Sequence, residues 1–321
     1  MSERIDVELP FARDGALRRV MRENVVQLAG FRAMLLQALS PAMTAGFLEH
    51  TDMFDSRAHT WRRLWRTRLV MNRIFFDDDP DEIQSMTAHI RRGHERVTGR
   101  LPAAAGRFEA GTPYRADDPD NLLWTLTTFA ESAWVFHAAF VDNSHELREA
   151  LWADFRIVGR LFGLTEEELP ETWAGMHAFI RGKVGDGSLA LIPEAREIAL
   201  ANLVEPPFPD GLAALSPFTG LATVALLPRW ARAAYGLRWP AALQPGWAAL
   251  ALNFRVAYGA LPAPVRYAPE WFGEFPRLPS FGDEPRPVRL PLRLDLGLAP
   301  HRRVMRFVVG GRPAAPAARA A

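Results

Sequence analysis

The sequence contains no cysteine among its 321 residues. Disulfide bonds, cysteine-ligated zinc, iron–sulfur clusters and thiolate-ligated haem are therefore excluded, and any metal or haem must be bound through histidine or oxygen ligands. A surplus of charge is also lacking, because 38 Lys and Arg residues stand against 37 Asp and Glu residues, for a net charge of +1. Nucleic-acid binding needs a basic surface, so we expect no nucleic-acid partner.

Long hydrophobic runs are few. Residues 1–15 are polar and lack the apolar core of a signal peptide, which predicts a cytoplasmic protein. Two uncharged stretches, 211–228 and 239–254, approach the length of a membrane span but are interrupted by proline. We interpret both as buried core helices or walls of an apolar cavity rather than spans. Shallow contact with a bilayer, as in a peripheral membrane protein, is the alternative.

Helical periodicity runs through almost the whole chain, and no apolar–polar alternation long enough for a strand precedes the C-terminal tail. The pattern predicts long helices over 15–39, 57–76, 80–98, 119–142 and 145–162, and shorter ones over 41–50, 170–184, 192–203, 212–226, 227–236, 243–257 and 262–272. The sequence thus predicts an all-α fold with one large helical domain over residues 15–275. A Pro- and Arg-rich irregular tail over 276–321 follows, whose last residues we expect to be disordered.

One of the eight histidines lies on an apolar helix face. Apolar residues recur at steps of three and four along the predicted helix 80–98, namely Ile83, Met86, Ile90 and Val97. His94 lies on this stripe, whereas His89 lies on the polar face. Gly93 has no side chain, so a flat group could approach the backbone there. His94 is therefore either a ligand to a metal or cofactor, or a core histidine with one satisfied hydrogen bond.

Three polar side chains share a face of the predicted helix 57–76. Arg63, Arg66 and Thr67 stand at positions i, i+3 and i+4, in a helix that is otherwise rich in tryptophan and leucine. Cations on a largely buried helix need partners, and an anionic ligand group such as a propionate would serve. The alternative is a solvated basic face paired with the acidic residues at positions 77–81.

Two residues at the end of the predicted helix 41–50 are further candidates. His50 shares a face with Met43 and Phe47, which makes it the rival of His94 as a buried ligand. Glu49 points about 100° away from His50. If it is buried, its pKa is raised and it can act as a base; the alternative is a carboxylate in water at the helix end.

Six collinear segments together resemble the MpaB-type oxygenase family, which includes the latex-clearing proteins (rubber oxygenases). They lie between about residues 25 and 240: FRAMLLQALSPAMTAGFLEHTDMF, RRLWRTRLVMNRIFFDDD, HIRRGHERVTG, YRADDPDNLLWTLTTFAES, LPETWAGMHAFI and LLPRWARAAYGLRW. The resemblance implies a globin-like helical core around haem b. It places the single proximal iron ligand on His94 and the distal Arg-x-x-Lys/Arg-Thr element on Arg63, Arg66 and Thr67.

The same resemblance implies a reaction. The catalytic base falls on Glu49, and Arg63 and Thr67 would also contact the cofactor. The expected activity is dioxygen-dependent cleavage of an isoprenoid-type carbon–carbon double bond in an apolar unsaturated small molecule. The alternative function is that of a non-catalytic helical protein that binds haem or a hydrophobic ligand and contacts membranes peripherally.

One position departs from the rubber oxygenases. They carry Lys where this chain has Arg66, and that lysine can cap the iron. Because an arginine side chain stays protonated, Arg66 cannot readily bind iron. We therefore expect no form of this protein in which residue 66 is an iron ligand, and a substrate other than rubber.

Overall fold

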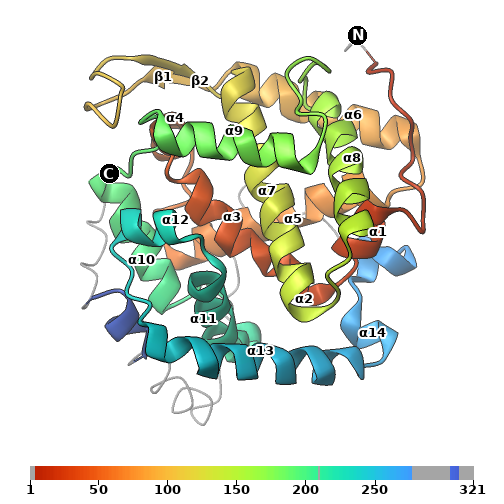
Figure 1. The fold of residues 1–321 in the computed structure, drawn as a ribbon. Coiled ribbons are helices and arrows are strands. Elements are labelled where there is room, and N and C mark those ends of the chain that lie inside the picture. Colours follow the sequence, from red (N-terminus) through yellow and green to blue (C-terminus); the bar gives the residue numbers. More distant parts are fainter. Residues whose placement is uncertain (1–3, 209, 277–303, 311–321) are drawn as a thin grey trace.

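The computed structural model describes residues 4–208, 210–276 and 304–310, and in these ranges the fold is all-α (Figure 1). Its α-helices are α1 Ala16–Met21, α2 Asn24–Gln27, α3 Ala29–Gln37, α4 Pro41–His50, α5 Arg57–Phe76, α6 Pro80–Glu95, α7 Pro119–Phe140, α8 His145–Leu161, α9 Trp173–Gly185, α10 Pro193–Val204, α11 Ser216–Leu226, α12 Arg229–Tyr235, α13 Gln244–Gly259 and α14 Ala263–Arg266. Short 3₁₀ helices are η1 Asp210–Leu215, η2 Ala241–Leu243 and η3 Pro269–Phe272.

Helix α7 passes through the middle of the fold, with α2, α3, α8 and α13 packed against it (Figure 1). A helix that is apolar on most of its circumference is stable only when other elements cover it on several sides. Trp124, Phe136 and Phe140 of α7 are each at most 1% exposed. Phe140 packs at the C-terminal end of α7 against Trp247 and Phe254 of α13, with ring centroids 6.0 and 5.2 Å away.

Local capping chemistry sets the start of the long helices where the sequence predicts it. The hydroxyl of Ser40 accepts a hydrogen bond from a backbone amide in the first turn of α4, and Ser144 does the same for α8. Asp79 and Asp118 cap α6 and α7, and proline occupies the first position of both helices. The predictions for helices 41–50 and 57–76 are confirmed to the residue.

The single helix expected over residues 15–39 is wrong, because the chain breaks into α1, α2 and α3. Glu23 interrupts it with an extended backbone (φ −70°, ψ 117°). The Glu23 carboxylate is buried and accepts hydrogen bonds from Arg266 at 2.8 and 3.0 Å, and the Arg22 carbonyl accepts one from the backbone amide of Ala268. These contacts with a segment about 240 residues away fix the break.

A strand pair also appears where only loop was expected. Strands β1 (Thr98–Arg100) and β2 (Pro113–Arg115) form an antiparallel hairpin between α6 and α7. Tyr114 of β2 is 5% exposed and packs with α4 residues. The expected disorder of the last residues lies outside the described residues, whereas Met305, Val308 and Val309 of the tail are buried in the core near α12.

The two uncharged stretches differ in their burial. Helix α11 is buried along the face that holds Thr219, Ala222 and Thr223, as expected. Helix α13 is not a buried core helix, because one of its sides lies on the surface of the fold (Figure 1). Across residues 4–208, 210–276 and 304–310, no helix has both the length and the apolar character of a membrane span.

A buried ion pair joins α3 to α7. Arg32 is 1% exposed and pairs with Glu131, while it also donates to the Ser132 hydroxyl at 2.7 Å and to the Leu226 carbonyl at 2.9 Å. Three elements, α3, α7 and α11, are therefore tied through one guanidinium group.

We expect Arg32→Ala to lower the free energy of unfolding by about 3–5 kcal/mol, because it leaves a largely buried carboxylate without its partner. Equilibrium unfolding in urea measures this. The control is Arg4→Ala, since the Arg4–Asp81 pair is exposed on both sides (66% and 77%) and should change stability by less than about 1 kcal/mol. Equal effects of the two substitutions would contradict the role of Arg32.

Candidate functional site

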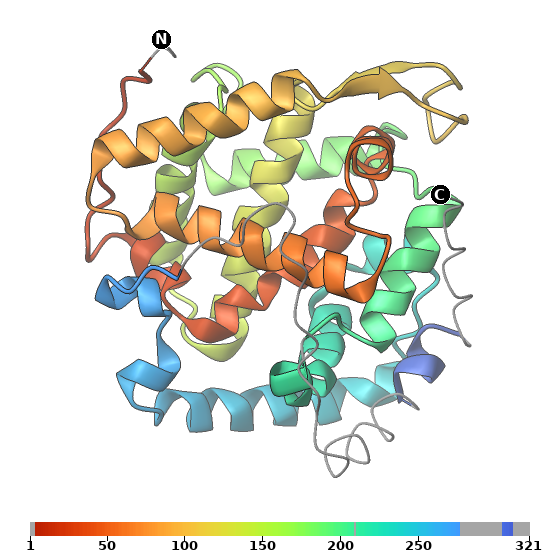
Figure 2. The ribbon, with the colours of Figure 1, turned by 180° about the vertical axis from the view of Figure 1, so that it is seen from behind.

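The candidate site lies between α5 and α6, which run side by side (Figure 2). Helix α6 turns Ile83, Gln84, Thr87 and Ala88 into the core in its first half and carries His94 near its end. His94 is half-buried, and His89 is exposed. The predicted difference between these two histidines is therefore confirmed. Gly93 is exposed, and a Cβ built on it would meet nothing within 4 Å, so its lack of a side chain has no packing reason here.

The imidazole of His94 has an unmet hydrogen-bonding group. Its Nδ1 atom is buried and has no hydrogen-bond partner within the described part of the chain. One wall of its surroundings is Phe162, whose ring stacks on the imidazole with centroids 6.4 Å apart and planes 26° apart. Buried polar atoms are usually paired, so this ring nitrogen, one of eight unpaired buried side-chain atoms in the described residues, is available to a partner outside the polypeptide.

The charge state of His94 follows from its surroundings. Burial lowers the pKa of His94 below its ordinary value of 6.5, and the nearby Arg63 cation lowers it further. Asp117, in the loop before α7, acts in the opposite direction as the smallest of the three influences. The imidazole is therefore neutral at pH 7, which is the form that binds metal ions.

The three polar residues of α5 differ in their burial and in their partners. Arg63 is half-buried, and burial is the main cause that lowers its pKa, followed by the Arg66 cation. Arg66 is also half-buried, with its pKa lowered by burial and by Arg62. Thr67 is exposed, and its hydroxyl donates to the Arg63 carbonyl at 2.9 Å. The structure thus brings Arg63 close to His94 and turns the Thr67 hydroxyl toward its own helix.

The acidic residues at positions 77–81 are not the partners of this basic face. Asp77 lies 3.6 Å from Arg73, and Asp78 pairs with Arg18 at 2.7 Å. Asp79 caps α6, and Asp81 pairs with Arg4. Within the ranges that the structure describes, no carboxylate lies within salt-bridge distance of the Arg63 guanidinium. The alternative of a basic face neutralised by positions 77–81 is therefore wrong for Arg63.

The end of α4 is more open than a buried base or ligand requires. Glu49 and His50 are both exposed. Glu49 accepts a hydrogen bond from the Tyr114 hydroxyl at 2.5 Å, and the Nε2 atom of His50 lies 3.1 Å from the Thr98 carbonyl oxygen. The burial that His50 would need as a rival ligand is not observed, because the β1–β2 hairpin takes up the polar groups of both residues at the surface. Glu49 matches the alternative of a carboxylate at a helix end.

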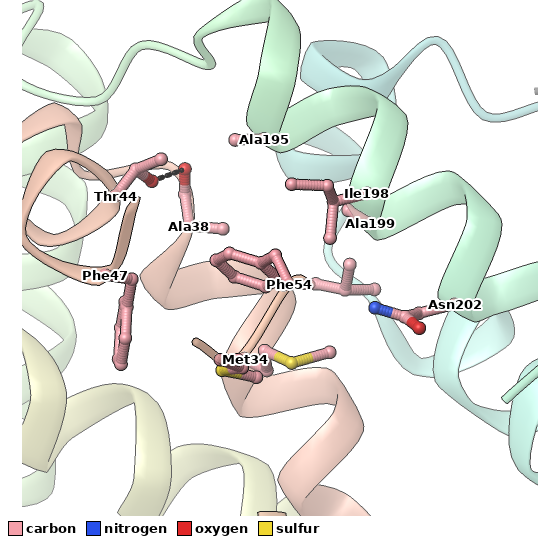
Figure 3. Close-up of a pocket in the computed structure, with 11 residues that line it drawn as sticks. Met34, Ala38, Thr44, Phe47, Phe54, Ala195, Ile198, Ala199 and Asn202 are labelled. Carbon is pink, nitrogen blue, oxygen red and sulfur yellow. Dashed lines mark hydrogen bonds between the residues drawn. The ribbon is translucent and has the colours of Figure 1, made fainter. Parts of the chain in front are cut away.

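An apolar pocket of about 40 Å³ lies on the other side of α4, between α3, α4 and α10 (Figure 3). Its walls are mostly aliphatic, aromatic or thioether groups: Met34, Leu35, Ala38, Phe47, Met53, Phe54, Ala195, Ile198 and Ala199. Thr44 also lines it, but its hydroxyl donates to the Ala38 carbonyl at 3.0 Å and so is satisfied. Asn202 adds one polar side chain. The pocket is far too small for a porphyrin and suits a small apolar group.

The pocket and the His94 cluster are separate but linked through α4 and α5. The Met53 carbonyl accepts a hydrogen bond from Thr60 at 2.7 Å, and Thr60 stands one turn before Arg63 on α5. On α4, Phe47 lines the pocket, and a Cβ on the adjacent Gly46 would lie 3.5 Å from Val97, three residues after His94. The apolar pocket and the His94 cluster therefore both adjoin helices α4 and α5.

Sequence reasoning missed three residues of this region. Asp117 and Tyr114 belong to one of the six quoted segments, but Tyr114 lies in the hairpin and Asp117 in the turn that follows it, which no helical periodicity could reveal. Phe162 follows α8, and only the packing of α6 beside α8 brings it to His94. For Asp117 and Tyr114, the only indication in the sequence was that they belong to the ordered set of six segments.

Comparison with known proteins places the chain in a family. Residues 18–256 match the family model described as ER-bound oxygenase mpaB/B'/Rubber oxygenase, catalytic domain. The match spans well over half of the sequence, so the chain belongs to this family, and membership supports an oxygenase role. No curated protein and no solved structure shows significant similarity to it.

We expect Arg63→Gln to raise the pKa of His94 toward 6.5, because the substitution removes a nearby cation. Titration of the His94 ring protons by NMR, in protein prepared without cofactor, measures the shift. Arg62→Gln is the matched control, since Arg62 lies next in sequence, pairs with Asp52, and is not among the groups that set the pKa of His94. The same shift in both variants would show that Arg63 has no direct effect.

Proposed function

We propose that this protein is a haem b-dependent oxygenase that uses dioxygen to oxygenate or cleave a carbon–carbon double bond of an apolar, isoprenoid-type small molecule. The observation that carries the proposal is the state of His94, a neutral imidazole with a buried and unpartnered nitrogen beside a half-buried arginine. Family membership supports the oxygenase class, and His94 stands in the segment from which the resemblance takes the iron ligand.

The residues present fit a haem. A proximal ligand is usually a neutral imidazole, which His94 provides. Arg63 lacks a carboxylate within salt-bridge distance in the described residues, and a propionate would supply one. Haem would satisfy both groups, because it carries a metal for the His94 imidazole and two carboxylates for the Arg63 guanidinium. A purely apolar ligand would satisfy neither. Haem iron, when bound, would supply the activation of dioxygen.

The chain's own side chains would then perform three tasks. His94 holds the cofactor, and the Phe162 ring fixes the plane of that imidazole and keeps water from it. Arg63 pairs with an anionic group, and burial keeps His94 neutral. The apolar pocket beside α4 binds a small apolar end of the substrate, which needs no hydrogen-bonding group there. We assign no catalytic step to Glu49, because its side chain is exposed and hydrogen-bonded to Tyr114.

We expect His94→Ala to abolish stable haem binding while His89→Ala leaves it intact. Both residues lie on α6, but only His94 is half-buried with an orphaned nitrogen. The Soret band and the haem-to-protein ratio of the purified variants measure the difference. Equal haem content in the wild type and in His94→Ala would refute the assignment, and loss in His50→Ala alone would move the ligand to α4.

We expect the haem-loaded protein to consume dioxygen and form carbonyl products from an isoprenoid alkene, as followed with an oxygen electrode and mass spectrometry. Ala199→Val should raise KM several-fold with an unchanged Soret band, since it fills part of the apolar pocket and each displaced CH₂ group is worth about 0.8 kcal/mol. A haem-loaded protein that turns over no alkene would instead support the haem- or ligand-binding alternative.

A further inference from the structure

One polar side chain lies unpaired among the apolar walls of the pocket between α3, α4 and α10. The face of α10 that lines this pocket consists of positions i, i+3, i+4 and i+7, which are Ala195, Ile198, Ala199 and Asn202. Asn202 is only 8% exposed, and its side chain forms no hydrogen bond within the described part of the chain. Figure 3 shows its amide turned from α10 toward the other lining side chains.

An unpaired amide at this position is unfavourable for the fold alone. A buried polar group without a hydrogen-bond partner destabilises a protein, whereas a leucine of similar size at position 202 would complete the apolar wall. Thr44, the other residue of the pocket with a polar side chain, is paired, because its hydroxyl donates to the Ala38 carbonyl at 3.0 Å. The amide of Asn202 is therefore available to a ligand in the pocket.

The hydrogen-bonding groups of this amide select the kind of ligand. An asparagine side chain offers two N–H donors and one carbonyl acceptor. A hydroxyl group both donates and accepts hydrogen bonds, so a single hydroxyl satisfies both ends of the amide, whichever way the amide is turned. A carbonyl or ether oxygen satisfies the N–H end only, and a hydrocarbon satisfies neither end.

Charge and volume narrow the ligand further. None of the described residues that line the pocket is charged, so a carboxylate or a diphosphate would lose its hydration there without gaining a cation. The volume of about 40 Å³ is roughly three times what one water molecule requires, which is room for the last few heavy atoms of a chain and not for a ring. A primary alcohol at the end of an apolar chain meets both limits.

We propose that the pocket binds the hydroxyl end of the substrate, which makes the substrate an isoprenoid alcohol rather than a hydrocarbon or a prenyl diphosphate. The carbonyl of Asn202 accepts the hydroxyl proton, and its N–H group donates to the hydroxyl oxygen. The apolar walls pack on the carbon atoms that precede this oxygen, so the bound end is apolar up to its last atom. Because the proposed function assigns one end of the substrate to this pocket, the choice of an alcohol rests on that function.

Two matched ligands test this site without any oxygen chemistry. Prenyl alcohol and trimethylethylene share one branched alkene and differ only in a hydroxyl group. Each is titrated into the purified full-length protein while proton–nitrogen NMR follows the side-chain amides, and the Asn202 signals are those that Asn202→Leu lacks. We expect prenyl alcohol to shift the Asn202 proton signals downfield in a saturable way, because they become hydrogen-bonded, and trimethylethylene to cause no downfield shift.

Substitutions of the two polar lining residues provide a second measurement, in which calorimetry gives both dissociation constants. The ratio of the constant for trimethylethylene to that for prenyl alcohol should fall at least about tenfold in Asn202→Leu, because only the alcohol loses hydrogen bonds. Thr44→Val is the matched control, since it removes a hydroxyl that is already bound within the chain, and the ratio should stay that of the wild type. Urea unfolding checks that each variant is folded.

Three results would overturn the proposal. One is the absence of a downfield shift at Asn202 with prenyl alcohol, and another is an equal ratio of dissociation constants in the wild type and in Asn202→Leu. The third is prenyl diphosphate that displaces prenyl alcohol with equal affinity. A protein that binds no haem, or a haem-loaded protein that turns over no alkene, would instead contradict the proposed function, and neither result alters these binding measurements.

Discussion

Burial of α7 from several sides is the constraint on which the rest of the fold depends. Its apolar residues run around most of the helix, so α2, α3, α8 and α13 must all pack on it. The polar groups that α7 carries into this core need partners there, and Arg32 meets that need for Glu131 and Ser132. Tying α3 to α7 in this way also sets the position of α4, which follows α3 directly and separates the apolar pocket from the His94 cluster.

The fully buried cations Arg18, Arg32 and Lys183 are paired, and the region between α5 and α6 differs from them. Arg18 donates to the carbonyls of Phe75 and Asp77 and pairs with Asp78. Arg63 has no such set in the described residues, and its neighbour His94 keeps an orphaned nitrogen. The Nε atoms of Arg22, Arg148 and Arg156 are also buried and unpaired in the described residues. It is the proximity of Arg63 and His94, more than either residue alone, that favours a ligand site here.

The features that sequence could predict are those determined by neighbours in the chain. Caps such as Ser40 and Asp79 act within one turn, so the starts of α4 and α6 follow from the sequence alone. Periodicity likewise separated His94 from His89. The break at Glu23 could not be foreseen, since it depends on Arg266 at the far end of the domain. The exposure of Glu49 depends on a three-residue strand whose length is below what periodicity can detect.

Hydropathy also could not tell which side of α13 faces water. An uncharged stretch fits a core helix and a surface helix equally well, and only the packing of Trp247 and Phe254 on Phe140 fixes its orientation. Arg255 on α13 was the one indication in the sequence, because an arginine is rarely buried without an acidic partner and this helix carries no acidic residue of its own.

The geometry of α7 relates the candidate site to α13. Its first turn follows Asp117, which lies close enough to His94 to affect the pKa of that imidazole, and its last residue, Phe140, packs on α13. Twenty-two helical residues span about 33 Å, so the candidate haem site and α13 lie near opposite ends of one helix.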